Sequence, residues 1–156
     1  MAVTHAALSA PPAPSKEMKI VVLFGYLLGI AFPVLETIRR GFGHWRVNST
    51  TMADDYIMGA VLLAACFSWS LNKRYAKILL VVAWAYVLGV MNAAFWGHFE
   101  GSLRGVVICD NNPGEVGAIA GKGVIWLIAL VCLVISTISM IREAKTPPRG
   151  LEPATA

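Results

Sequence analysis

The chain has 156 residues and a formal net charge of +4, with 57% hydrophobic and only 14% charged residues. A soluble domain carries about 25% charged residues, so this chain has too little polar surface to cover a globule in water. The basic residues are scattered in short segments and form no basic stripe, which excludes a nucleic-acid footprint. With a mean hydropathy of +0.66, we expect one domain that is an integral membrane protein whose main partner is the lipid bilayer.

Residues 1–17 precede the first apolar segment and begin with an Ala- and Pro-rich stretch that has no hydrophobic periodicity. We therefore expect a disordered N-terminal tail. The tail lacks the early basic residues of a signal peptide, and no small-residue cleavage site follows the first apolar segment. We expect that segment to stay in place as an uncleaved anchor.

Four long apolar segments follow, and their cores contain no Asp, Glu, Lys, Arg or His. A helix needs about 20 largely apolar residues to cross a bilayer, and the first two segments reach that length only with their polar flanks. The fold predicted is an all-α integral membrane protein, a four-transmembrane-helix bundle in up-down order. The domain covers 18–142, a cytoplasmic C-terminal tail covers 143–156, and the spans lie at about 18–38, 55–72, 77–99 and 120–141.

The distribution of Lys and Arg predicts the orientation of the chain. Eight of these residues lie in the two tails and the second loop, and five lie in the first and third loops. Because basic residues favour the cytoplasmic side, we expect both termini on the cytoplasmic side of the membrane. We expect that membrane to be a bacterial inner membrane. The margin is small, since Arg39 and Arg40 lie on the outer side.

The third loop, 101–123, is the longest and contains six glycines. Its turn residues from Asp110 to Gly114 separate a short apolar piece from the last span. We expect a plain surface loop, with a small hairpin or a lid over the bundle end as the alternative. The role of Cys109 in this loop stays open, whereas Cys66 and Cys132 lie inside apolar segments and are expected in the core.

Three carboxylates lie at the outer end of the predicted bundle: Glu36, Asp55 and Glu100. Helical phase places Glu36 on the face of Gly29 and Asp55 on the face of Gly59 and Cys66. It places Glu100 near the small residues of the third span, with Asn92 and Trp96 beside it and His98 about 160° away. The candidate polar cluster at this end consists of Glu36, Arg40, His44, Asp55, Asn92, Trp96, His98, Glu100 and Arg104.

Small residues recur at helical spacing in three of the spans and predict close helix packing. Gly25 and Gly29 form a GxxxG pair in the first span, and a second ridge recurs every four residues in the third. Such faces serve the bundle itself, a second copy of the chain or another membrane protein. The predicted packing residues are Gly25, Gly29, Gly59, Gly89, Ala93 and Gly97.

Two interpretations of the outer-end cluster remain open. In the first, Glu36 pairs with Arg40, Glu100 pairs with Arg104, and Asp54 and Asp55 cap the second helix, so the charges fasten the bundle. In the second, the carboxylates converge on a water-filled mouth that binds a cation, a proton or a polar ligand.

The function is not readable from a motif. The chain contains no HExxH, P-loop, GxSxG or dinucleotide fingerprint, and none of the four apolar cores contains a histidine that would hold haem. We therefore expect no cofactor, no metal and no assigned catalytic residue. The leading hypothesis is a non-enzymatic accessory or interaction component. The alternatives are a small transporter or ion conduit that uses the carboxylates, and a membrane enzyme that acts at the same end with His44 or His98.

Overall fold

The structure is a computed structural model that describes residues 15–43, 49–105 and 115–145. Within these ranges the chain forms four α-helices and no strand. They are α1 (Lys16–Arg40), α2 (Ser49–Ser70), α3 (Ala76–Leu103) and α4 (Glu115–Lys145). Each contains a stretch long and apolar enough to cross a membrane. This confirms the all-helical class and supports a multi-pass membrane protein.

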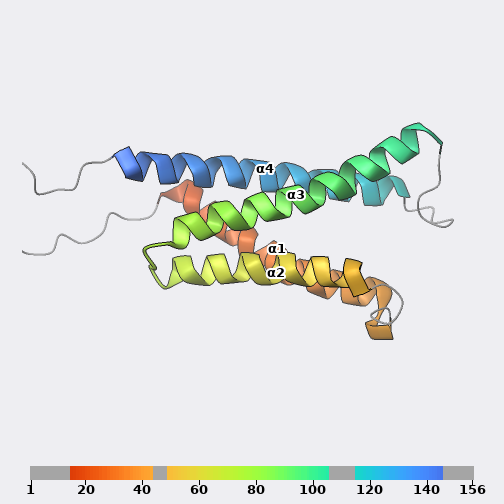
Figure 1. Ribbon diagram of the computed structural model, residues 1–156, viewed down its shortest axis with the longest axis horizontal. Helices are drawn as coiled ribbons and strands as arrows, with labels where there is room; N and C mark the ends of the chain where they lie inside the picture. Colours follow the sequence, from red (N-terminus) through yellow and green to blue (C-terminus); the bar gives the residue numbers. More distant parts are fainter. Residues whose placement is uncertain (1–14, 44–48, 106–114, 146–156) are drawn as a thin grey trace, which may run out of the picture.

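The helices pack in chain order: α1 against α2, α2 against α3, and α3 against α4, with a smaller contact between α1 and α4. In Figure 1 the start of α1, the turn between α2 and α3, and the end of α4 lie at one end of the molecule. The ends of α1 and α3 lie at the opposite end, called the outer end below. This arrangement is consistent with a four-helix bundle.

The core is built from stripes of residues spaced alternately by three and four positions. In α3 this stripe contains Leu80, Trp84, Val87 and Met91, all buried. The same spacing in α1 runs through Val22, Gly25, Gly29, Phe32 and Glu36. This alternation is the packing pattern of helices that cross at a shallow angle. Large apolar side chains such as Leu23, Leu27 and Ile30 are exposed on the opposite side of α1, as expected for a surface that faces lipid.

The tightest crossing joins α1 and α2 near the middle of α1. A Cβ atom at Gly59 would lie 2.6 Å from the carbonyl oxygen of Gly29 and 2.9 Å from Cδ of Pro33. A Cβ at Gly29 would lie 2.9 Å from Cγ of Leu63. The absence of side chains at these two glycines therefore lets the two backbones meet, as the small-residue spacing predicts.

The helices extend beyond the predicted spans, with the largest differences at the start of α2 and around the third loop. Ser49 begins α2 six residues before the predicted start, so its first turn contains no acidic residue. The interpretation of Asp54 and Asp55 as capping residues is therefore wrong, because both lie in the second turn, beyond the unpaired N–H groups. Likewise α3 extends to Leu103 and α4 begins at Glu115, so much of the predicted loop is helical. Cys109 and the turn residues lie outside the described residues.

Local signals fix the ends that the structure describes. The hydroxyl of Ser15 accepts a hydrogen bond from the N–H of Met18 at 3.4 Å and caps α1. Gly41, with φ of 73°, ends α1, and its N–H donates to the carbonyl of Thr37 at 2.7 Å. Asn72 has φ of 51° in the turn before α3, a conformation that Asn tolerates better than most residues.

Candidate functional site

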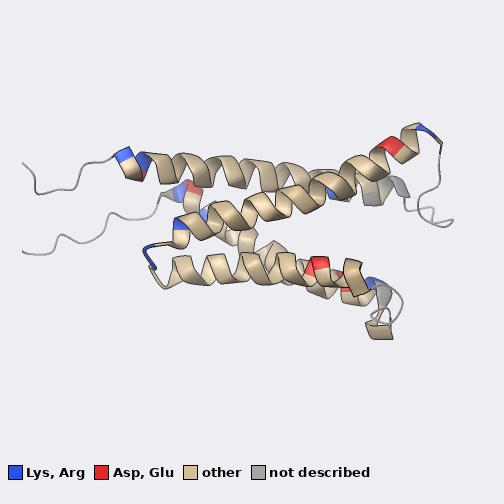
Figure 2. Cartoon of the chain, viewed as in Figure 1, with Lys and Arg blue, Asp and Glu red and all other residues tan. Residues whose placement is uncertain are grey.

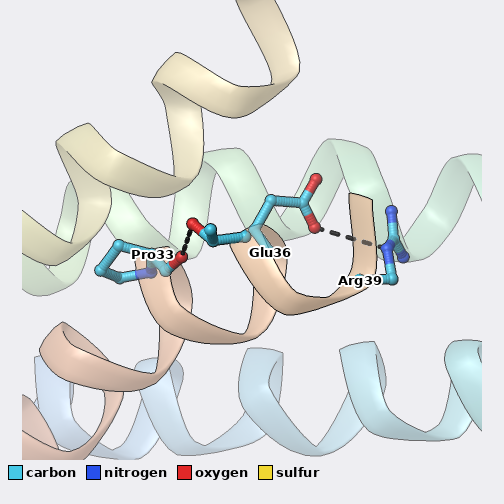
Figure 3. A network of polar contacts seen from close by, with 4 residues as sticks. Pro33, Glu36 and Arg39 are labelled. Atoms are coloured by element: carbon cyan, nitrogen blue, oxygen red, sulfur yellow. Dashed lines mark hydrogen bonds and ion pairs between the residues drawn. The ribbon is translucent and has the colours of Figure 1, made fainter. Parts of the chain in front are cut away.

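Glu36 is the least exposed carboxylate of the described residues, at 8%. It continues the buried stripe of α1 beyond Phe32, because Pro33 does not interrupt the helix. One of its oxygens, Oε2, lies 3.4 Å from Nε of Arg39 (Figure 3). The sequence predicted Arg40 as the partner, but the side chain of Arg40 lies outside the described residues. The carboxylate therefore lies inside the helix packing, and its arginine reaches it from the exposed side of α1.

A pair of hydroxyl groups next to Glu36 joins α1 to α2. Oγ1 of Thr37 donates to the carbonyl oxygen of Pro33 at 2.6 Å and lies 2.6 Å from the hydroxyl oxygen of Tyr56. Sequence reasoning missed both residues. The spacing of Thr37 four positions after Pro33 is the signal that could have found the first bond, since Thr often bonds to the carbonyl one turn back. The bond to Tyr56 has no such local signal.

Asp55 is half-buried, lies next to Tyr56 on α2 and is engaged in an interaction. Since Thr37 and Tyr56 are hydrogen-bonded, the segments that carry Glu36 and Asp55 meet at the same helix crossing. Two of the three predicted carboxylates are thus chain neighbours of the same hydrogen bond between α1 and α2. We call this region, made of Glu36, Thr37, Asp55 and Tyr56, the α1–α2 polar cluster.

Glu100 does not join that cluster. Its side chain is 60% exposed and forms an ion pair with Arg104 one turn later on α3, the pairing that the spacing predicts. Figure 2 shows the acidic residue of α3 well separated from the acidic residues of α1 and α2. The predicted convergence of all three carboxylates at one mouth is therefore not found in the folded chain.

The two histidines of the candidate cluster have different outcomes. His98 is half-buried and engaged in an interaction, and its position continues the buried stripe of α3 seven residues after Met91. Because α3 stays helical through Glu100, His98 lies on a different side of the helix from that carboxylate, as its phase predicts. His44 lies outside the described residues.

Asn92 and Trp96 belong to an aromatic cluster between α3 and α4. Oδ1 of Asn92 accepts a hydrogen bond from Nε1 of Trp126 at 3.2 Å, so this amide links two helices. The rings of Phe95 and Trp96 lie 5.1 Å apart, and both pack against Trp126 at 6.1 and 6.3 Å. The edge-to-face angle of 84° between Trp96 and Trp126 is a favourable geometry for such pairs. These contacts tie α3 to α4 near the outer end.

The predicted small-residue faces also divide into two groups. Gly25, Gly29 and Gly59 are buried where helices cross. Gly89, Ala93 and Gly97 are exposed on α3, and Cβ atoms at the two glycines would have no neighbour within 4 Å. Within residues 15–43, 49–105 and 115–145, no helix packs against this exposed ridge.

The arrangement offers hydrogen-bonding and ion-pairing groups. Among the described residues, no three His, Cys, Asp or Glu side chains are close enough together to hold a metal ion. The thiols of Cys66 and Cys132 are free and buried in the core. No protein-family model, curated protein or solved structure matches the chain, so the site must be interpreted from its own geometry.

Proposed function

We propose that the chain is a non-enzymatic accessory component of a bacterial inner membrane that binds another membrane helix through α3. In this proposal the four helices span the bilayer in up-down order, with both termini in the cytoplasm. The excess of Lys and Arg in the tails and the second loop supports that orientation. The partner is a second copy of the chain or a different membrane protein.

The observation that carries this proposal is the exposed ridge of Gly89, Ala93 and Gly97. Small residues spaced by four let two helices approach closely and form many van der Waals contacts. A ridge that faces lipid does not form these contacts. The comparable residues Gly25, Gly29 and Gly59 are already used inside the chain. The ridge on α3 is thus a packing surface that none of the four described helices covers.

Filling the ridge should separate the complex without unfolding the bundle. We expect the double variant Gly89→Leu, Gly97→Leu to weaken association about tenfold or more, since the leucines would hold the partner helix away. The measurement is cross-linking in intact membranes, followed by the mass of the complex in mild detergent. The matched control is Ala64→Leu, which enlarges an exposed small residue on α2. Wild-type protein that cross-links neither to a second copy nor to any other protein in its own membrane, or a double variant that associates normally, would contradict the proposal.

A second candidate function, a cation or proton conduit, is supported by the buried position of Glu36. A carboxylate in a membrane-spanning region is costly and is most often found where it serves a function. We propose that, in this case, the α1–α2 polar cluster binds the transported ion.

Neutralising Glu36 separates this second candidate from the first. In proteoliposomes with an imposed gradient, Glu36→Gln should abolish ion flux, because the neutral amide keeps the size of the side chain but removes its charge. Glu100→Gln is the control, since that carboxylate is exposed and lies apart from the cluster. Purified wild-type protein that moves neither a proton nor a cation removes the basis for a conduit.

A further inference from the structure

Pro33 removes one backbone hydrogen bond from α1, at a position where α1 packs against α2. Proline has no N–H, so the carbonyl oxygen of Gly29, one turn earlier, loses its usual partner within the helix. The backbone of Gly59 lies against this oxygen, close enough that an added Cβ would be 2.6 Å from it. Such an approach places the Cα–H groups of Gly59 near the carbonyl oxygen of Gly29, a weak but recurrent helix–helix contact. The two halves of α1 are therefore joined with one backbone hydrogen bond fewer than an uninterrupted helix.

The half of α1 after Pro33 is held to α2 by a hydrogen bond whose direction the geometry decides. Thr37 has one hydroxyl proton, and it goes to the carbonyl oxygen of Pro33. The hydroxyl of Tyr56 must therefore donate to Oγ1 of Thr37, at 2.6 Å. The half before Pro33 has a similar bond, because the hydroxyl oxygens of Tyr26 and Ser70 lie 2.9 Å apart. Each half of α1 is thus joined to α2 by a hydrogen bond of one tyrosine: Tyr26 of α1 before Pro33, and Tyr56 of α2 after it.

The segment of α1 after Pro33 is short and contains Glu36. It runs from residue 34 to residue 40, about two helical turns. A groove of about 290 Å³ lies along this segment on the outside of the α1–α2 pair, with Pro33, Thr37 and Tyr56 in its wall. The remaining lining residues are Val34, Ile38 and Phe42. Along this groove the described residues of α1 and α2 are not packed tightly against each other.

We propose that Pro33 is a hinge and that the hydrogen bond between Tyr56 and Thr37 is the latch that keeps the outer end of α1 closed. When the latch opens, residues 34–40 move away from α2 and the carboxylate of Glu36 becomes accessible to water. The half of α1 before Pro33 stays in place, because Gly25 and Gly29 remain packed against α2. This device does not depend on whether the protein is an accessory component or a conduit.

The test compares two tyrosines that differ in their position relative to the hinge. Tyr56→Phe removes the hydroxyl of the latch and keeps the ring, whereas Tyr26→Phe removes the matching hydroxyl before Pro33. Loss of one hydrogen bond should raise amide hydrogen exchange about fivefold over residues 34–40. Exchange over residues 20–30 should not change in Tyr56→Phe, and exchange over 34–40 should not change in Tyr26→Phe. The measurement is exchange followed by mass spectrometry on the full chain in lipid nanodiscs.

Two further readouts decide the outcome. Because Tyr56 takes part in another interaction besides the latch, Thr37→Val should reproduce the faster exchange without altering the tyrosine. Labelling by a water-soluble carbodiimide should increase about fivefold at Glu36 in both variants and stay constant at the exposed Glu100. The proposal is overturned if residues 34–40 exchange at the wild-type rate in both variants. It is also overturned if exchange rises equally over the whole of α1, which would indicate general destabilisation instead of a hinge.

Discussion

Replacing Gly59 with alanine should lower the free energy of unfolding by about 3 kcal/mol, the upper end of the usual cost of overpacking. The new methyl group would lie 2.6 Å from the carbonyl oxygen of Gly29 and 2.9 Å from Cδ of Pro33. Both are parts of the backbone or of a rigid ring, so neither can rotate away. The strain is relieved only if α1 and α2 move apart, which also loosens the α1–α2 polar cluster. The measurement is an SDS unfolding titration in mixed micelles, followed by helical circular dichroism.

Two other glycines provide graded controls for Gly59→Ala. A methyl group at Gly25 would overlap the sulfur of Cys66, but that sulfur is the end of a rotatable side chain. We therefore expect a smaller loss for Gly25→Ala, and a partial recovery when it is combined with Cys66→Ala. At Gly97 no atom lies within 4 Å of the added methyl, so Gly97→Ala should be nearly neutral. Helix propensity alone would favour alanine at all three positions. Equal effects at the three positions would therefore contradict the close crossing as the cause of the lost stability.

The sequence predicts the helices of this fold well and their inward faces poorly. Four long segments without charge leave little choice but helices, because lipid cannot satisfy backbone N–H and C=O groups. Which side of each helix faces the core is harder to predict, since the lipid-facing side is also apolar and hydrophobic periodicity is weak. Two small-residue ridges therefore resembled each other in sequence, although Gly29 is buried and Gly97 is exposed.

The same difference explains why only part of the candidate site could be predicted: local spacing within one helix is readable, but the rotation of each helix in the bundle is not. The burial of Glu36 follows from its spacing of seven residues from Gly29, which is local information within one helix. The position of Glu100 depends on how α3 is rotated in the bundle, and the sequence does not encode this rotation in a simple period. The bond between Thr37 and Tyr56 joins residues on different helices, so only the packing of α1 on α2 reveals it.

Helix ends were misplaced where polar residues continue a helix beyond its apolar core. The apolar segment indicates that α2 begins near residue 55, but the turn that starts at Ser49 is helical too. Ser and Thr are frequent at helix starts, because their hydroxyl groups can bond to free N–H groups there. This error of six residues changed the interpretation of Asp54 and Asp55 from capping residues to residues inside the helix.

Trp84→Ala should destabilise the bundle by about 3 kcal/mol or more, as removal of large buried aromatic side chains does. Trp84 is the largest fully buried side chain of the described residues, at 0% exposure, and belongs to the central core cluster. Within a bilayer the main loss is van der Waals contact, because lipid chains would solvate an exposed ring almost equally well. The cavity left between the helices therefore determines the size of the effect, measured by the same SDS titration.

Two comparisons identify the origin of this effect. Trp96→Ala removes a ring of the same size that is 46% exposed, so it should cost much less than Trp84→Ala. Trp84→Phe keeps most of the ring but removes Nε1–H, which has no hydrogen-bond partner among the described residues. If packing dominates, Trp84→Phe should lose only a small part of the stability lost in Trp84→Ala. A loss as large as that of alanine would mean that Nε1–H makes an essential hydrogen bond and would refute the packing explanation, because a phenylalanine ring fills most of the same space.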